Sequence, residues 1–414
     1  MKKIILSAVA LSTLSMSAYA SKARLVALGD EVEDNYYVMD SRYIFTNVSF
    51  ANEYANQIFL EWGGTASASA STLDTDSDPK AQGGFLKKSG NYTYGAYLGN
   101  ESNVSSFLRI LASSQTNLLK TADNQVDLFL AGGNDLKWGF NFLYAGAEKK
   151  ETGKETIDDS AMAMRLGAHQ DNWDAFANIS LKSESENKND TSKPKFEGKL
   201  GFQVGGSYTM SDVKFHGSYK KFDWEQTRAN VKTDGGFTRL DLGFGKNYKV
   251  ADEGSVFARV QFSKLNVELD FAGGKSELDS SILPLVIGYE GKATSWLTLR
   301  GSVSHNLYSK VKSKNLSSVI QGTVGVDTVA NLQYKALQSY NGSTADGEST
   351  VANSTTINAG ATLEFGALSI DGFVGTTTGN RTDDGDATTT DHDTKKGVLS
   401  TDNLLTRVGM TYKF

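Results

Sequence analysis

Two kinds of side chain alternate over the last eleven residues of the chain, from Leu404 to Phe414. Val408, Met410, Tyr412 and Phe414 share one parity with Leu404 and Thr406, whereas Leu405, Arg407, Gly409, Thr411 and Lys413 share the other. Successive side chains of a β-strand point to opposite faces, so one face here is nearly all apolar and the other is mostly polar or small. A strand with an apolar outside and a polar inside is typical of a transmembrane β-barrel.

The same alternation recurs along the chain in pairs of strands joined by short turns. In one such strand Leu240, Leu242 and Phe244 oppose Arg239 and Asp241. Seven tight hairpins and one unpaired strand near each end, the first beginning near Ile58, predict sixteen strands. The sequence therefore predicts an all-β fold, a transmembrane antiparallel up-and-down β-barrel with sixteen strands, and fourteen or eighteen as alternatives. A soluble β-sandwich or a β-solenoid is the other fold considered, but no fixed-period repeat is visible.

The first twenty residues have the pattern of a secretory signal peptide. Met1-Lys2-Lys3 precedes an apolar run from Ile4 to Met16, and Ala18-Tyr19-Ala20 is an A-x-A cleavage site. The apolar run is shorter than the roughly 20 residues that a spanning helix needs, which disfavours a membrane anchor. We expect export through the Sec pathway and cleavage before Ser21.

Composition narrows the class of protein further. The chain has no cysteine, which excludes disulfides and thiolate metal sites, and only 3 prolines, which suits long hydrogen-bonded strands. The formal net charge of −6 argues against a nucleic-acid partner.

We divide the chain into a signal peptide (1–20), an N-terminal segment (21–53) and a barrel (54–414). The segment is expected to form a plug in the lumen, a periplasmic lead-in or a loosely packed arm.

Assigning the apolar parity to lipid predicts which side chains line the lumen. A basic residue facing lipid at the middle of the membrane costs about 2–4 kcal/mol, so the position of the charged residues decides the assignment. On one strand, for example, Phe196 and Phe202 are predicted to face lipid. The predicted pore-lining residues are Arg165, Lys199, Lys214, His216, Arg239, Asp241, Arg259, Arg300, Glu364, Asp371 and Arg407. Both signs of charge in a wide lumen predict a water-filled channel, although paired charges without selectivity would look the same in sequence.

Aromatic residues and loops complete the predicted barrel. Trp138, Trp173 and Trp296 lie near short turns, and Trp62 and Trp224 near long loops, which predicts two aromatic girdles. Loops 100–123 and 310–350 contain apolar residues and are candidates for constricting the pore. Two acidic runs, around Asp74 and Asp383, could bind divalent ions or could simply be solvated loops.

Nothing in the sequence indicates an enzyme. The only four histidines are His169, His216, His305 and His392, and none belongs to a HExxH or comparable arrangement. We expect no catalytic residue, no metal site and no cofactor.

Over residues 57–414 the chain resembles the sixteen-stranded porins of Gram-negative outer membranes. The resemblance rests on the alternation of tight turns with long loops and on Met410-Thr411-Tyr412-Lys413-Phe414 at the end. It implies passive diffusion of small hydrophilic solutes, a homotrimer, and outer-membrane lipid and lipopolysaccharide as surroundings. It also implies that Tyr412 and Phe414 signal to the barrel assembly machinery. The chain lacks the Pro-Glu-Phe-Gly-Gly motif of porin constriction loops.

The stretches 40–62 and 365–372 also look like the major outer-membrane proteins of predatory Bdellovibrio-type bacteria. Two other functions remain as alternatives. One is a hydrophobic-solute transporter similar to the fatty-acid transporter family, with the N-terminal segment as hatch. The other is a structural or adhesive barrel with a closed lumen.

Overall fold

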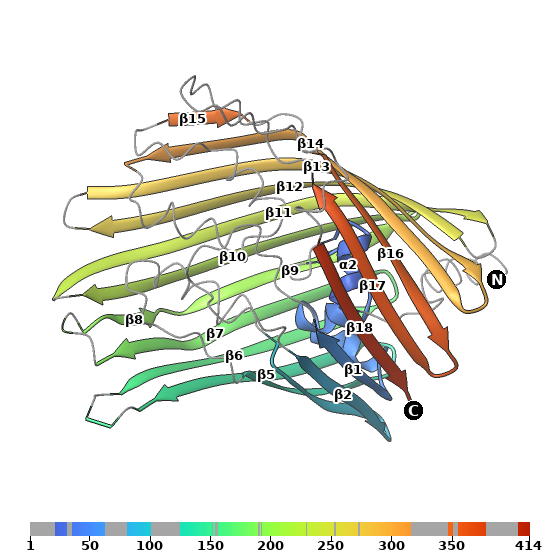
Figure 1. Cartoon of the computed structure of the whole chain (residues 1–414), viewed down its shortest axis with the longest axis horizontal. Helices are drawn as coiled ribbons and strands as arrows, with labels where there is room; N and C mark the ends of the chain where they lie inside the picture. The colour runs from blue at the N-terminus through green and yellow to red at the C-terminus, as the bar shows by residue number, and fades with distance from the viewer. Residues whose placement is uncertain are drawn as a thin grey trace, which may run out of the picture.

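The structure is a computed structural model that describes residues 21–30, 35–62, 81–100, 125–150, 152–153, 156–188, 191, 193–228, 230–251, 254–271, 274–315, 347–350, 355–377 and 405–414. Eighteen strand segments form one antiparallel sheet in this part of the chain (Figure 1). Their bounds are β1 Gln57–Trp62, β2 Gln82–Ser89, β3 Tyr92–Leu98, β4 Gln125–Gly133, β5 Lys137–Lys149, β6 Ile157–Gln170, β7 Trp173–Asn187, β8 Lys195–Gly198, β9 Gly201–Met210, β10 Val213–Arg228, β11 Val231–Ala251, β12 Gly254–Phe271, β13 Gly274–Thr294, β14 Leu297–Lys314, β15 Gly347–Thr350, β16 Thr355–Phe365, β17 Leu368–Thr377 and β18 Leu405–Lys413.

The eighteen segments occupy sixteen positions around the barrel. β8 and β9 both lie between β7 and β10, and β15 and β16 both pair with β14, so two positions hold two segments each. The predicted sixteen-stranded antiparallel barrel is therefore confirmed for the described residues.

The barrel closes between its first and last strands. β1 pairs with β18 over its whole length, with Ile58 opposite Tyr412 and Trp62 opposite Val408. A barrel with one strand outside the hairpins near each end predicts that these two strands pair. Closure leaves no unpaired sheet edge along this seam, as a membrane-spanning sheet requires.

All seven predicted hairpins are present. Their turns need backbone conformations that few residues adopt. Ser211 and Asp212, for example, have positive φ values of 51° and 64°, which match the two central residues of a type I′ turn. Gly366, with φ of 62°, starts the turn between β16 and β17.

Outward and inward faces of the barrel differ as the alternation predicted. Outward side chains such as Phe140, Leu242 and Phe244 are 38–50% exposed, whereas inward Asp241 and Asp371 are at most 1% exposed. An outer apolar band with a polar interior is the arrangement that a lipid bilayer demands.

Several strands are much longer than a bilayer crossing. β11 and β13 each have 21 residues, whereas a tilted strand needs about 9–11 to cross the hydrocarbon. Away from the short turns the pattern inverts: Phe222, Trp224 and Val267 face inward and are 1–3% exposed. On the outer face Lys221 and Asp223 pair at 3.0 Å. The prediction that Trp224 belongs to an aromatic girdle is therefore wrong, because Trp224 shares the inward parity of His216 and Ser218.

One extra residue reverses the faces of the strand formed by β8 and β9. Gly198 lies opposite Trp224, but Phe202 lies opposite Lys221, so the register shifts by one residue between the two segments. Phe196 is consequently buried at 0% exposure, whereas Phe202 is 38% exposed. The prediction that both residues face lipid is wrong for Phe196.

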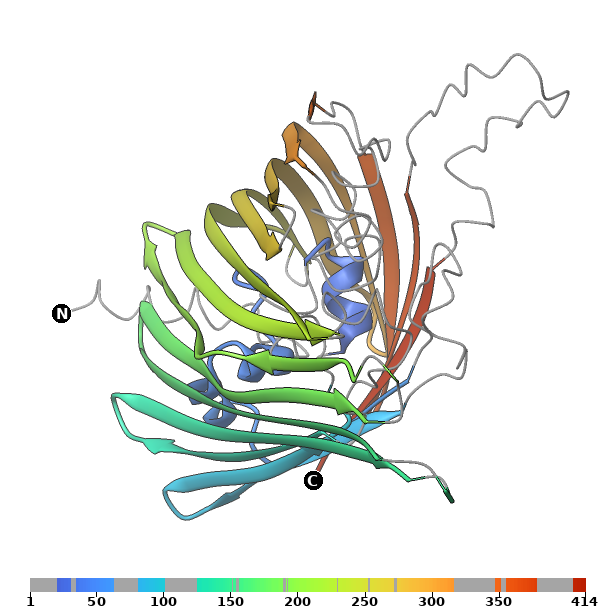
Figure 2. The ribbon, with the colours of Figure 1, turned by 90° about the vertical axis from the view of Figure 1, so that its left-hand side faces the viewer.

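Three short helices precede β1 in the N-terminal segment. They are α2 (Lys22–Ala27) and the 3₁₀ helices η2 (Ser41–Phe45) and η3 (Val48–Asn52). Ser21, Asp40 and Asn47 cap them, each accepting a backbone N–H two or three residues later. In Figure 2 the helices, in blue, lie within the curved wall of strands. No helix in the described part of the chain is long and apolar enough to span a membrane.

Candidate functional site

The N-terminal segment contacts the inner wall on several sides of the barrel. α2 packs against β14, β16, β17 and β18, whereas η3 packs against β3, β4, β5 and β6. Other residues of the segment contact inward side chains of β10 and β12, His216 and Arg259, so the segment touches the closed wall on opposite sides and lies in the lumen. The interior side chains and this segment together form the candidate site.

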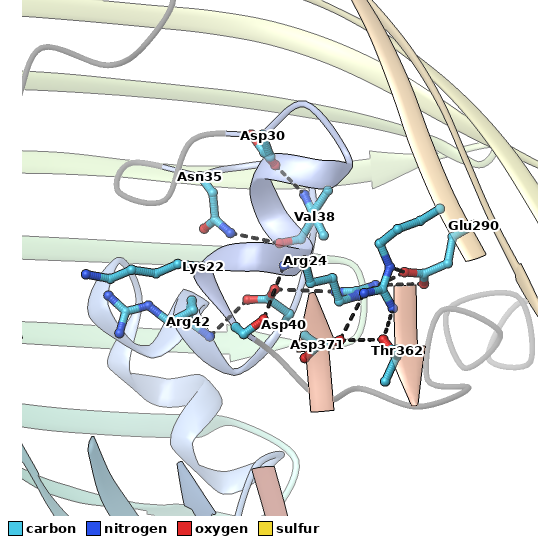
Figure 3. A network of polar contacts seen from close by, with 12 residues as sticks. Lys22, Arg24, Asp30, Asn35, Val38, Asp40, Arg42, Glu290, Thr362 and Asp371 are labelled. Atoms are coloured by element: carbon cyan, nitrogen blue, oxygen red, sulfur yellow. Dashed lines mark hydrogen bonds and ion pairs between the residues drawn. The ribbon is translucent and has the colours of Figure 1, made fainter. Parts of the chain in front are cut away.

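Arg24 in α2 is the centre of a buried polar network (Figure 3). Its Nε and Nη2 atoms donate to the two carboxylate oxygens of Glu290 on β13, at 3.0 and 2.9 Å. Its Nη1 lies 3.4 Å from Asp40 in the same segment. Arg24 is 1% exposed, so this bidentate pair fixes α2 to the wall without competition from water.

Arg300 and Asp371, two of the predicted pore-lining residues, join this network. Arg300 on β14 lies 2.9 Å from Glu290 and 2.9 Å from Asp371 on β17, and it also donates to the Thr362 hydroxyl. Two arginines thus share one glutamate. The wall and the segment are joined by one continuous set of ion pairs.

A second ion pair holds the turn after α2. Arg259 on β12, another predicted pore-lining residue, lies 3.1 Å from Asp30 and also donates to the backbone oxygen of Gly29. Both charged side chains are at most 2% exposed. Leu25, Leu28 and Tyr37 pack beside the pair against Phe257 and Val286 of the wall.

The middle of the segment binds β7, β9 and β10 through aromatic residues. Tyr36 stacks on His216 with ring centroids 5.3 Å apart, and its hydroxyl contacts Ser218 at 2.7 Å. The hydroxyl of Tyr43 donates to Asp174 at 3.0 Å. Burial, reinforced by Asp174, raises the pKa of Tyr43 well above its usual value, so its hydroxyl stays a donor.

Lys214, also predicted to line the pore, extends toward the same part of the segment. Its Nζ lies 3.0 Å from the sulfur of Met39 and 5.3 Å from the centre of the Tyr43 ring. The ring face attracts the ammonium group electrostatically. Lys214 therefore adds a cation–π contact to the hydrogen bonds that hold η2.

The end of the segment is fixed to the seam strand β1. Arg42 lies 3.3 Å from Glu61 on β1 and donates to Asn100 at 2.7 Å, while Tyr97 donates to Glu61 at 3.0 Å. Ile44, Val48 and Ala51 pack nearby against Phe59, Leu86, Tyr97, Phe129 and Ala131 of the wall.

Wall glycines make room for the segment. A β-carbon added at Gly139 would lie 2.5 Å from the Val48 backbone oxygen, and one at Gly360 would lie 2.6 Å from the Ala27 β-carbon. Real β-carbons do not approach other atoms so closely. Each of these positions therefore requires glycine if the segment is to lie against the wall.

Two of the predicted pore-lining arginines, Arg165 and Arg239, form ion pairs with carboxylates of the wall itself. Arg165 lies 2.5 Å from Asp127 and also donates to Asn141. Arg239 lies 2.8 Å from Asp241, which also accepts from Ser263 and Gln261. These side chains are all buried, so they form paired ladders rather than isolated charges.

The remaining predicted residues have different positions. Glu364 lies 3.9 Å from Lys292 near a short turn. Arg407 belongs to β18, but its side chain lies outside the described ones. Lys199 occupies the break between β8 and β9, where its exposed ammonium lies 2.9 Å from the equally exposed Asp234. The prediction that Lys199 lines the lumen is wrong, because the extra residue at this break turns it outward.

Sequence reasoning missed the partners that the segment supplies. Arg24, Asp30 and Arg42 are charged residues in a mixed stretch without clear periodicity, and nothing local shows which wall residue each contacts.

Among the described residues no group of three or more His, Asp or Glu could hold a metal ion. Most of loops 100–123 and 310–350, and both acidic runs, lie outside the described residues.

Comparison with known proteins gives the following. No family model matches the chain, and no curated protein matches it. Solved structures that it resembles include the Pseudomonas putida toluene transporter TodX (13% identity, 94% of this chain and 96% of that chain, TM-score 0.35). A bacterial polysaccharide outer-membrane secretin is similar at 8% identity over 87% of this chain and 99% of that chain, with a TM-score of 0.46. A porin is similar at 11% identity over 86% of this chain and 99% of that chain, with a TM-score of 0.36.

Proposed function

We propose that this chain is an outer-membrane porin, a water-filled channel for passive diffusion of small hydrophilic solutes and ions. The N-terminal segment is proposed to act as a plug that restricts this channel. The observation that carries the proposal is the inner wall at the level of the segment. It carries buried charged side chains that contact a separate stretch of chain, beside smaller apolar clusters.

The porin proposal rests on the ability of a charged wall to stay stable in contact with water. When the plug moves away, a broken ion pair between wall and plug is replaced by hydration of both charges, and small polar solutes can contact them as well. An apolar core exposed in the same way would have no such compensation. A polar wall therefore allows the plug to shift while the barrel stays intact.

A hydrophobic-solute transporter is the second candidate. It is favoured by the apolar inner wall farther from the short turns, where Phe196, Phe222, Trp224 and Phe237 are at most 4% exposed. Such a surface could receive an apolar solute from outside the cell. The plug would then serve as a hatch.

Swelling of proteoliposomes distinguishes the two candidates. The porin proposal predicts swelling in solutions of small neutral sugars, at rates that fall steeply as the sugar becomes larger. Uptake of a fatty acid or an aromatic hydrocarbon without any sugar permeation would overturn it in favour of the transporter. Permeation of neither class would favour a structural barrel.

A further inference from the structure

The last helix of the plug, η3, contacts a histidine of the barrel wall. His169 lies at the end of β6, next to the short turn that leads to β7. The ring of Phe50 stacks on its imidazole with ring centroids 4.0 Å apart. Its Nδ1 lies 2.8 Å from the hydroxyl oxygen of Ser49, and its Nε2 lies 3.5 Å from a carboxylate oxygen of Glu53. Both ring nitrogens of this wall residue therefore contact the end of the plug.

A chain of hydrogen bonds continues from Ser49 to Asn47, the N-cap of η3. The Ser49 hydroxyl donates to Oδ1 of Asn47 at 2.7 Å, and the Ser49 backbone N–H donates to the same oxygen. The amide nitrogen of Asn47 donates to Asp174 on β7 at 3.2 Å. Only the nitrogen of an amide can donate, so these partners fix its orientation. The Asn47 oxygen is an acceptor and cannot supply a proton to Ser49.

Three contacts in this chain each need one proton. They are His169 Nδ1 with Ser49, Ser49 with Asn47, and His169 Nε2 with Glu53. A neutral imidazole has one N–H and the serine hydroxyl has one hydrogen, so a neutral ring leaves one contact without a proton. It either presents a bare nitrogen to the carboxylate or breaks the bond between Ser49 and its neighbours. An imidazolium has a proton on both nitrogens and fills all three contacts.

The surroundings of His169 also favour the charged ring. In the sheet His169 lies opposite Asp174 of β7 and opposite Lys137 of β5. With Glu53, two carboxylates and one ammonium group thus face the ring from the elements packed against it. The aromatic face of Phe50 attracts a cation as well. Farther out, Lys88 interacts electrostatically with Glu53, and Lys214 with Asp174.

Glu53 keeps its charge in this arrangement. The hydrogen bond from His169 lowers the pKa of the Glu53 carboxyl group below its usual value, although burial acts in the opposite direction. Ser49 is 0% exposed, so water does not replace a missing partner at its hydroxyl. The state of the ring therefore determines how many of the contacts of η3 can be made.

We propose that His169 is a proton-operated latch for the end of the plug: the protonated ring holds η3 against β6, and loss of the proton loosens η3. The docked plug binds the proton more tightly than the released plug. Docking of η3 therefore weakens as pH rises through the range from 5 to 8, in which histidine ordinarily loses its charge. As a control of solute flow the latch rests on the proposed porin function.

Amide hydrogen exchange measures the latch without any transport assay. The backbone N–H groups of Phe50 and Glu53 donate to the Asn47 and Phe50 carbonyl oxygens, so they exchange only when η3 opens. Rates in the refolded full chain are divided by rates in the unfolded chain at the same pH, which removes the intrinsic effect of pH on exchange. Protection of residues 48–53 should fall between pH 5.5 and pH 8. Protection that does not fall would overturn the proposal.

Replacing the histidine isolates its contribution. Asp40, whose pKa burial raises to about 7, also affects docking in this range, but its effect is shared by all chains compared. Protection should fall about fivefold more in the wild-type chain than in His169→Gln, as expected when one hydrogen bond to a charged group is lost at a partly exposed site. The control is His305→Gln, since Nδ1 of His305 contacts Thr355 on the wall at 2.9 Å. This control should match the wild-type chain.

Equal falls in the wild-type chain and in His169→Gln would refute the latch. Ser49→Ala tests the proton count separately, because it keeps the histidine and Glu53 but removes the contact that a neutral ring cannot fill. Its fall should exceed that of His169→Gln by less than about threefold, which a half-exposed ion pair alone can supply. A fall as large as in the wild-type chain would overturn the proposal. A chain without conductance would refute the porin function, whereas these exchange results would still test the latch.

Discussion

Replacing Arg24 by methionine should release the plug. Methionine keeps most of the length of the side chain but has no charge, so Glu290 and Asp40 lose the guanidinium that lies 2.9 and 3.4 Å from them. Removing one partner of a buried ion pair costs about 3–5 kcal/mol. Glu290 keeps Arg300 at 2.9 Å, so the lower end of this range applies.

A loss of about 3 kcal/mol corresponds to roughly a hundredfold change in the docking equilibrium, since 1.4 kcal/mol is tenfold. Trypsin cleavage after Arg42 follows the population of released plug when release and docking are fast compared with cleavage. The cleavage rate in Arg24→Met should therefore rise by about two orders of magnitude, while the barrel keeps its strand content by circular dichroism.

Lys199→Met is the matched control. It removes one positive charge with the same replacement, but from an exposed pair with Asp234 whose side chains are both more than half exposed. Exposed pairs contribute about 0–1 kcal/mol, so this variant should be cleaved at the wild-type rate. If Arg24→Met were cleaved no faster than Lys199→Met, the ion pairs would not hold the plug.

Three further predictions concern packing, pH and assembly. Gly139→Ala should loosen η3, because the new β-carbon meets the Val48 carbonyl, and should speed trypsin cleavage after Arg42; Gly372→Ala, where no atom lies within 4 Å, should not. Docking should weaken as pH rises from about 4 to 7, because only the docked form keeps the Asp40 proton in that range, and Asp40→Asn should flatten the profile. Deleting Phe414 should lower the amount of barrel in the outer membrane without blocking export, and normal membrane levels would contradict the predicted assembly signal.

The sequence predicted the barrel well because alternation is local. On a regular strand the type of each side chain indicates which face it occupies. An even number of strands also predicted that the last strand closes the barrel against the strand near Ile58, as it does. Alternation fails where one extra residue enters a strand. Lys199 and Phe196 were therefore assigned to the wrong faces, since the register shift between β8 and β9 leaves no mark in composition.

The contacts of the plug could not be predicted for a different reason. Its ion pairs join residues separated by up to 266 positions, as between Arg24 and Glu290, and each depends on where the chain runs inside the lumen. Sequence reasoning did predict that Arg259, Arg300 and Asp371 face inward. Their partners depend on the three-dimensional course of residues 21–53, which no periodicity encodes.

Single-channel recording in planar bilayers tests most directly whether the N-terminal segment controls a conducting lumen. Purified wild-type protein and Arg24→Met are compared at the same protein concentration, with Lys199→Met as control. Our account predicts discrete ohmic steps for all three proteins, with larger or more frequent openings in Arg24→Met alone. Absence of conductance in every protein, or equal conductance in wild type and Arg24→Met despite a released plug, would contradict it.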